Sequence, residues 1–201
     1  MKKKSINNLG KLNQYWGICG FSSCFYAMHM IGGKRTKEEL DNAKNPTRVL
    51  AEIKTYLMML KIDEETQLLQ DIQEFTRSFG KEYKDFTIDN YIKFINTILV
   101  KTPDEIIKSN YSIAMPPHAV VDYLQRVFER KAKLKKGPFK RTPSKGIVGV
   151  RIDKNTMYDG LCHYMYINKR TVYSWGKKFK SIDEAAIKGI TWEVCCHISV
   201  S

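Results

Sequence analysis

The chain has 201 residues, 43% of them apolar and 11% aromatic, which is enough for one compact domain with a sizeable core. Its 34 lysines and arginines outnumber its 21 acidic residues, and the formal net charge of +13 favours anionic partners without specifying a chemistry. The apolar runs are too short for a membrane-spanning helix, and polar residues follow the basic N-terminus where an export signal would need an apolar run. We therefore expect a single domain over residues 1–201 that works in the cytoplasm, away from membranes.

The five cysteines also indicate a reducing compartment, because their odd number and irregular spacing argue for free thiols rather than a disulfide framework. Two groups of adjacent ligand-type residues, Cys162-His163 and Cys195-Cys196-His197, lie in segments with strand character. Neighbouring side chains of a strand point to opposite faces, so these groups do not suit a shared metal ion. No metal site is expected.

The first predicted element is a buried helix over Cys19–Ile31, which is apolar on most faces and is followed by the helix stop Gly32-Gly33. Helical periodicity then recurs through the middle of the chain. The segments concerned are residues 49–60, 63–79, 88–99 and 120–128.

Residues 130–145 hold eight lysines and arginines and no acidic residue, which is typical of an exposed basic loop that steers substrates. After this stretch the pattern changes to short runs rich in β-branched and aromatic residues, as expected for strands. These runs are residues 146–152, 161–167, 170–175 and 191–200. The order predicts an α+β fold, with a helical lobe over about 1–135 packed on a C-terminal antiparallel sheet over about 146–201.

Cys19 is a candidate nucleophile because it stands at the start of the first predicted helix. Unpaired peptide N–H groups and the helix dipole stabilise a thiolate at that position. Gly20 follows directly, and we expect its missing side chain to let a substrate backbone approach the sulfur.

A thiol nucleophile needs a base within hydrogen-bond reach, and the chain has four histidines. His29 lies ten residues further along the helix of Cys19, about 15 Å away, so it cannot reach the sulfur. His163 begins a predicted strand and is the favoured base, with His118 and His197 as alternatives.

The third member of the site depends on a predicted hairpin. A turn at Asn168-Lys169 would place Ser174 directly opposite His163, on the same face, where its hydroxyl can orient the imidazole. A one-residue change of register would instead bring Trp175 opposite His163.

The segment Asn13–Ser23 resembles the nucleophile segment of papain-like cysteine peptidases, in which a glutamine upstream of the cysteine faces the oxyanion. Here Gln14 lies five residues before Cys19, whereas the plant and lysosomal members have six, and no tryptophan follows the cysteine. The resemblance is therefore to a distant branch and implies Gln14 as the oxyanion donor.

A second segment matches the same family. Gly160 before His163 resembles the small residue that precedes the family's histidine strand, and residues 172–176 resemble its Asn-Ser-Trp-Gly segment. The family's asparagine orients the histidine, and strict alignment puts Tyr173 at that position, so Ser174 and Tyr173 stay open as alternatives.

The resemblance implies a papain-like fold, no metal or organic cofactor, and acyl transfer from an amide through Cys19 and His163. It further implies proteolysis of a protein substrate. The positive net charge of the chain would favour an acidic substrate. The compact, lysine-rich chain resembles bacterial toxin or effector domains, which act in the cytoplasm of a target cell and meet an inhibitor or immunity protein in the producer. Glutamine deamidases, transglutaminases and peptidoglycan amidases share this machinery and remain alternatives.

A different class of function is non-catalytic binding of nucleic acid by the basic stretch. Phe139 is its one aromatic residue, and no zinc-finger, ribonucleoprotein or basic-zipper pattern occurs in the sequence. Nucleic acid is therefore the less favoured partner.

Overall fold

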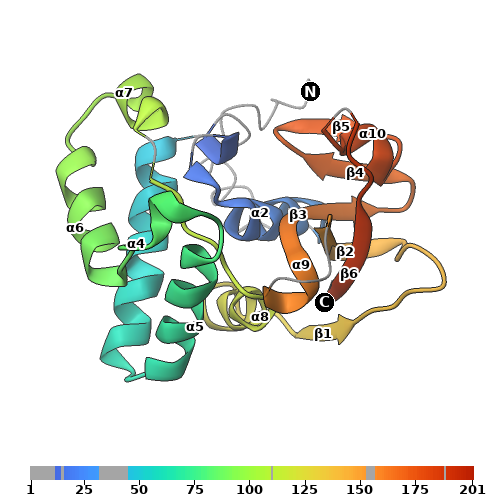
Figure 1. Ribbon diagram of the computed structural model, residues 1–201, viewed down its shortest axis with the longest axis horizontal. Coiled ribbons are helices and arrows are strands. Elements are labelled where there is room, and N and C mark those ends of the chain that lie inside the picture. The colour runs from blue at the N-terminus through green and yellow to red at the C-terminus, as the bar shows by residue number, and fades with distance from the viewer. Residues whose placement is uncertain (1–11, 15, 32–44, 110, 153–156, 188) are drawn as a thin grey trace.

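The computed structural model describes residues 12–14, 16–31, 45–109, 111–152, 157–187 and 189–201. They form an α+β structure in which helices and an antiparallel sheet occupy opposite sides, with helix α2 (Cys19–Ile31) between them (Figure 1). The helical side holds α4 (Pro46–Ile62), α5 (Thr66–Arg77), η1 (Lys81–Tyr83), α6 (Ile88–Ile98), α7 (Pro103–Lys108) and α8 (Pro117–Arg126). The sheet side holds β1 (Ala132–Lys136), β2 (Lys145–Arg151), α9 (Met157–Gly160), β3 (Leu161–Asn168), β4 (Thr171–Ser174), β5 (Lys177–Phe179), α10 (Ile182–Ala185) and β6 (Glu193–Val200).

Three of the middle helices, α4, α6 and α7, begin at polar caps that satisfy some of their first peptide groups. Asn45 accepts a hydrogen bond from the N–H of Thr47 at 3.0 Å, and Pro46 follows as the first residue of α4. Thr102 and Glu105 form a reciprocal capping box at the start of α7. The helical ranges predicted from periodicity are confirmed to within a few residues, whereas the predicted stop at Gly32-Gly33 lies outside the described residues.

Six strands of the described chain form one antiparallel sheet in the order β1-β6-β2-β3-β4-β5. Four were expected from the sequence, and the two edge strands, β1 and β5, were not. β1 falls inside the basic stretch predicted as a loop, where Leu134 pairs with Ile198 of β6. Lysines on an edge strand discourage pairing with other chains, so the charge that indicated a loop also suits a sheet edge.

The predicted turn at Asn168-Lys169 is wrong. Asn168 pairs with Thr171, so the turn consists of Lys169 and Arg170, and Lys169 takes a positive φ of 59°. The N–H of Lys169 donates to the carbonyl of Ser144 at 2.7 Å, a tertiary contact that stabilises this turn. Continuing this register puts Ser174 opposite residue 165, a shift of two residues that keeps it on the face of His163.

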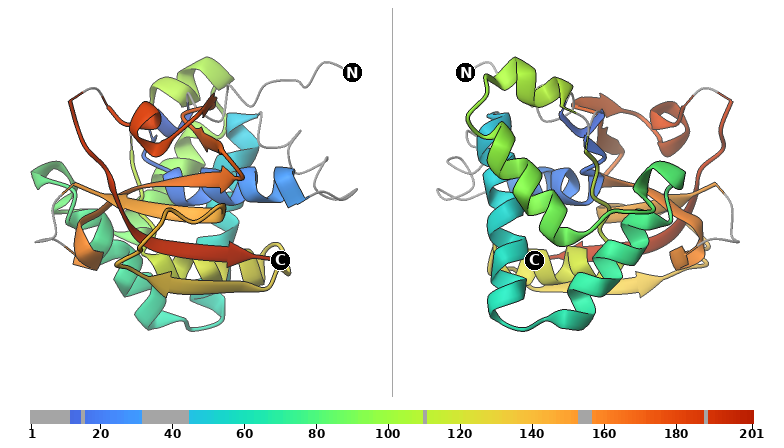
Figure 2. Two further views of the ribbon diagram at one scale, coloured as in Figure 1. Left: turned by 90° about the vertical axis from the view of Figure 1, so that its right-hand side faces the viewer. Right: turned by 60° about the vertical axis from the view of Figure 1, so that its left-hand side comes forward.

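Helix α2 packs on β3, and the main core surrounds it (Figure 2). Phe21 meets the rings of Tyr56 and Tyr123 at centroid distances of 6.1 and 4.9 Å, both edge to face. A second apolar cluster, which includes Met165, Ile182 and Trp192, joins alternate residues of the sheet to α10 and the segment before β6. The helix that begins with Cys19 is therefore held rigidly against the strand that carries His163.

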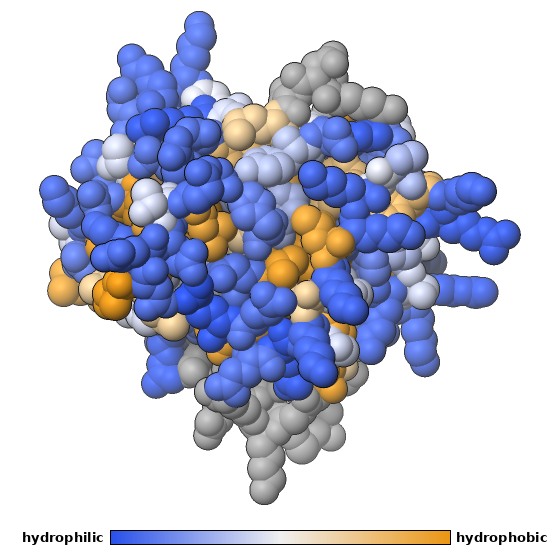
Figure 3. Space-filling model, turned by 90° about the horizontal axis from the view of Figure 1, so that it is seen from below, coloured by the Kyte–Doolittle hydropathy of each residue, from blue (hydrophilic) through white to orange (hydrophobic). Residues whose placement is uncertain are grey.

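The outer surface is predominantly hydrophilic on the face shown in Figure 3, where apolar side chains form small, separate groups. Within the described residues, no helix is both long enough and apolar enough to cross a bilayer.

Candidate active site

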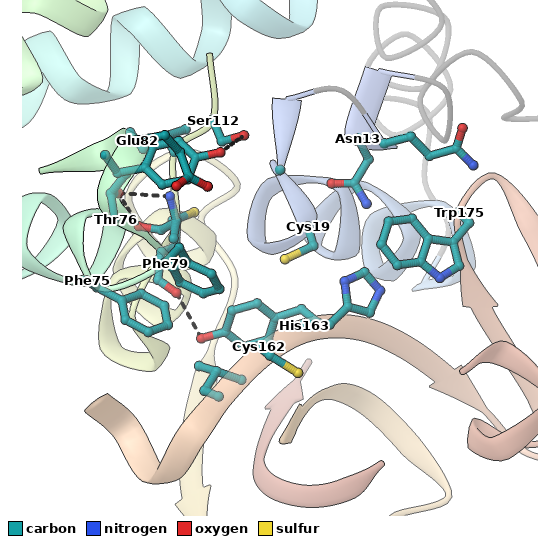
Figure 4. Close-up of a pocket in the computed structure, with 18 residues that line it drawn as sticks. Asn13, Cys19, Phe75, Thr76, Phe79, Glu82, Ser112, Cys162, His163 and Trp175 are labelled. Carbon is teal, nitrogen blue, oxygen red and sulfur yellow. Dashed lines mark hydrogen bonds between the residues drawn. The ribbon is translucent and has the colours of Figure 1, made fainter. Parts of the chain in front are cut away.

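A cavity of about 280 Å³ lies between the helical side and the sheet (Figure 4). Cys19 and His163 both line it, although they are far apart in the sequence. Cys162, Trp175 and Gln14 belong to the same lining. Three of the four residues predicted for the site therefore meet at one cavity, and the fourth, Ser174, contacts His163 from outside the lining.

Cys19 is the first residue of α2 and is half-buried. Its carbonyl accepts the hydroxyl of Ser22 at 3.1 Å within the first turn of the helix. Burial raises the pKa of the thiol to about 11, although the backbone N–H groups of Tyr164 and Gly20 lower it in part. The sulfur thus lies beside the backbone of the residue after His163, and at neutral pH it carries its proton.

Gly20 packs closely against the chain itself. The residue is buried, and a Cβ atom there would stand 3.0 Å from the Cβ of Met115. Gly17 has a φ of +56°, and a Cβ atom there would stand 2.9 Å from Ser112. Both glycines let the chain around Cys19 approach residues 112–115, which form another wall of the cavity.

His163 is 4% exposed, and its Nε2 lies 2.8 Å from the hydroxyl oxygen of Ser174. Burial lowers the pKa of this imidazole to about 3, so the ring is neutral at physiological pH. When Nε2–H donates to Ser174, Nδ1 carries the lone pair and is the nitrogen able to accept a proton. Tyr173, the alternative orienting residue, instead lies near Tyr26, with their ring centroids 6.1 Å apart.

Trp175 stacks on the imidazole of His163, with ring centroids 4.2 Å apart and an interplanar angle of 9° (Figure 4). A tight turn presents it, because Trp175 and Gly176 join β4 to β5 and have φ of 51° and 73°. Positive φ at both central residues is the requirement of a type I′ hairpin turn. The ring centroid of Trp192 lies 5.3 Å from that of the same imidazole. This contact was not predicted, because no pattern in the sequence around Trp192 indicates it.

Tyr26 connects the cysteine helix to the histidine hairpin. Its hydroxyl accepts the N–H of Gly176 at 2.8 Å, so α2 holds the turn that presents Trp175. Tyr26 is 3% exposed, and burial raises the pKa of its hydroxyl to about 12. The two halves of the site are thus joined by a partly buried hydrogen bond as well as by packing.

Two side-chain amides line the cavity near Cys19. Gln14, the predicted oxyanion donor, has an exposed side chain. Asn13 is 3% exposed, and its Oδ1 has no hydrogen-bond partner among the described residues. A buried amide with an unmet hydrogen bond is suited to a ligand in the cavity. Sequence reasoning missed Asn13, although its distance of six residues from Cys19 was a signal that could have identified it.

The wall opposite comes from α5 and the segment after it (Figure 4). Phe75, Phe79 and Tyr83 make it largely aromatic, and Glu82 is the one acidic residue that lines the cavity within the described chain. The cavity therefore offers a neutral thiol and imidazole beside an apolar surface with a single carboxylate.

The other histidines and cysteines lie elsewhere. His118 pairs with Asp71 at 2.7 Å on the helical side, and Nε2 of His197 lies 2.8 Å from the carbonyl oxygen of Lys145. Cys24, Cys195 and Cys196 are buried and free. No group of three or more metal-ligating side chains occurs among the residues described.

Comparison with protein-family models, with curated proteins and with solved structures finds no match to this chain. The arrangement of Cys19, His163 and Ser174 is therefore the basis for inferring a function.

Proposed function

We propose that the chain is a papain-like cysteine protease in which Cys19 is the nucleophile and His163 the base. The observation that supports this most strongly is the cavity that Cys19, at the start of a helix, shares with the buried His163. Nε2 of this histidine contacts the hydroxyl of Ser174. The fold supports it too, because the cysteine helix packs on the histidine strand in the way the family resemblance implies.

The chemistry begins from neutral groups. Because burial raises the pKa of Cys19 and lowers that of His163, a preformed thiolate–imidazolium pair is not favoured. Nδ1 of His163 takes the thiol proton as the sulfur attacks the amide carbonyl, and Ser174 holds the ring in the required orientation. The same proton then goes to the leaving amine, and water hydrolyses the thioester.

The negative charge that develops on the carbonyl oxygen needs donors that are already in place. The N–H of Cys19 is among the first in α2 and has no acceptor within the helix. A carboxamide beside the cavity supplies the second donor through its side-chain N–H, and we propose Asn13 for it ahead of Gln14, since Asn13 is buried at the cavity whereas the side chain of Gln14 is exposed. Donors of this kind contribute about 3 kcal/mol each to transition-state stabilisation.

The proposed context is a bacterial toxin or effector domain that cleaves a protein in the cytoplasm of a target cell and that an inhibitor or immunity protein restrains. A deamidase, transglutaminase or peptidoglycan amidase would use the same groups. Proteomics separates these reactions, because proteolysis creates new chain termini, deamidation replaces an amide with a carboxyl group, and transglutamination creates a cross-link.

Cysteine labelling tests the proposal, with Cys162 as an internal control. Cys19 and Cys162 are both half-buried, line the same cavity and have a pKa raised by burial to about 11. Burial alone would make them react alike with iodoacetamide near neutral pH. We expect faster labelling of Cys19, measured by peptide mass spectrometry, because only this thiol has His163 as a base.

His163→Ala should remove the difference between the two thiols, whereas His118→Ala, which removes a histidine outside the cavity, should preserve it. Equal labelling of Cys19 and Cys162 in the unmodified chain would exclude the proposed pair.

A further inference from the structure

A second hollow, of about 580 Å³, lies on the sheet side of the molecule. Four separate segments form it: residues 139–144 between β1 and β2, the β3–β4 hairpin at 167–172, residues 180–183, and the start of β6 at 192–194. We call this hollow the basic groove. It includes the end of the basic stretch that the proposed function leaves without a role.

Five cations surround the basic groove, and all of them are exposed. They are Lys140, Arg141, Lys169, Arg170 and Lys180. None of them forms an ion pair with a residue in the described parts of the chain. Of the two acids in the lining, Glu193 is already bound by Arg151 at 2.8 and 3.1 Å, which leaves a strong excess of positive charge.

The lining also has an apolar component, which distinguishes it from a simple cationic surface. Ile167, Val172 and Ile182 belong to the second apolar cluster and contribute to the groove. A rim of cations around apolar side chains suits an extended peptide that carries both acidic and apolar residues. The carboxylate of Asp183 adds an acceptor for the N–H groups of a peptide. A phosphodiester backbone has no N–H group to donate.

The aromatic residues of the groove argue against single-stranded nucleic acid, which binds basic surfaces by stacking bases on free aromatic faces. Phe139 already has the ammonium of Lys135 over its ring at 5.9 Å and the ring of His197 edge-on at 6.4 Å. Trp192 is 7% exposed and lies beside His163. Trp192 is therefore too buried to stack a base, and the ring of Phe139 already has two partners.

Trp192 also connects the groove to the catalytic cavity. It lines the groove, and its ring lies 5.3 Å from that of His163, so a peptide in the groove would be separated from the base by one indole. We propose that the basic groove docks an acidic, extended segment of the protein on which the Cys19 site acts. That the docked protein is the substrate rests on the proposed function, whereas the binding of an acidic peptide does not.

The binding test uses the full chain with Cys19→Ala, so that no reaction can occur. The probe is a fluorescently labelled peptide of alternating glutamate and leucine, and binding is followed by fluorescence anisotropy. Arg141→Gln with Arg170→Gln should weaken binding about tenfold, since two exposed ion pairs are lost. The matched control, Lys131→Gln with Lys133→Gln, removes the same charge outside the groove and should change affinity less than about twofold.

Equal weakening by the two double variants would overturn the proposal, because net charge rather than the groove would then determine binding. An oligothymidylate of equal charge that binds as tightly and depends on Arg141 and Arg170 would assign the groove to nucleic acid instead. Absence of peptide binding would also refute the docking site. None of these outcomes depends on catalysis. The proposed function is tested separately, by comparing the labelling rates of Cys19 and Cys162 in the chain with its native cysteines.

Discussion

Protonation of His163 should destabilise the fold as the pH falls. The ring is 4% exposed, and its pKa drops from an ordinary value of 6.5 to about 3 because burial penalises the charged form. Above pH 6.5 the imidazole is neutral in both the folded and the unfolded chain, and stability is complete. Below it, the unfolded chain binds a proton that the folded chain cannot, so the free energy of unfolding decreases until about pH 3.

The size of the effect follows from the two pKa values. Between pH 7 and pH 4.5, a group that titrates at 6.5 when unfolded and at about 3 when folded removes roughly 2–3 kcal/mol of stability. This is a large share of the roughly 5–15 kcal/mol that stabilises an ordinary domain. The loss should therefore be measurable by equilibrium unfolding.

Urea denaturation at the two pH values measures the loss directly. His163→Gln removes the titrating group, and the free energy of unfolding of this variant should decrease by roughly 2–3 kcal/mol less than that of the unmodified chain. The comparison between pH values within each protein cancels the packing cost of the substitution. An identical pH dependence in both proteins would refute the burial of a neutral His163.

Three further predictions concern the site. Ser174→Ala should slow the labelling of Cys19 about tenfold or more, because the Ser174 hydroxyl, 2.8 Å from Nε2 of His163, orients the proposed base. Ser174→Thr keeps a hydroxyl and should recover part of the rate. An unchanged rate in Ser174→Ala would remove Ser174 from the site. Gly20→Ala should cost about 1–3 kcal/mol in thermal or urea unfolding, because its Cβ would press on a buried side chain, and an unchanged stability would contradict that packing. Once a cleaved substrate is known, Asn13→Ala should lower kcat about 100-fold, more than Gln14→Ala does, if Asn13 is the oxyanion donor; the reverse order would return that role to Gln14.

The helices and most strands follow from local patterns in the sequence. The run from Cys19 to Ile31 lacks a breaker after Gly20 and forms α2 with those bounds, because an apolar stretch of this length is buried most readily as a helix. Residues 161–167 are a short, largely apolar and aromatic run and form β3, with one further residue at its end. The candidate pair Cys19 and His163 follows from similarly local signals, a helix start and a strand start.

The remaining features depend on contacts between distant segments. The turn lies one residue beyond the predicted Asn168-Lys169, which shifts the strand pairing by two residues. The N–H of Lys169 donates there to the carbonyl of Ser144, a partner that no local pattern contains. Ser174 still reaches His163, since a shift of two residues preserves the face of a strand.

The choice between Asn13 and Gln14 also depended on burial, because adjacent amides in one helical turn point in different directions. The position of Trp192 and the basic groove could not be predicted from the sequence either. Residues from four segments meet there only after the sheet has formed, and neither hydrophobic periodicity nor motif spacing encodes which side chains it brings together. Local sequence thus specified the elements and the candidate pair Cys19 and His163, while packing decided the register, the burial of Asn13 and the surface beside His163.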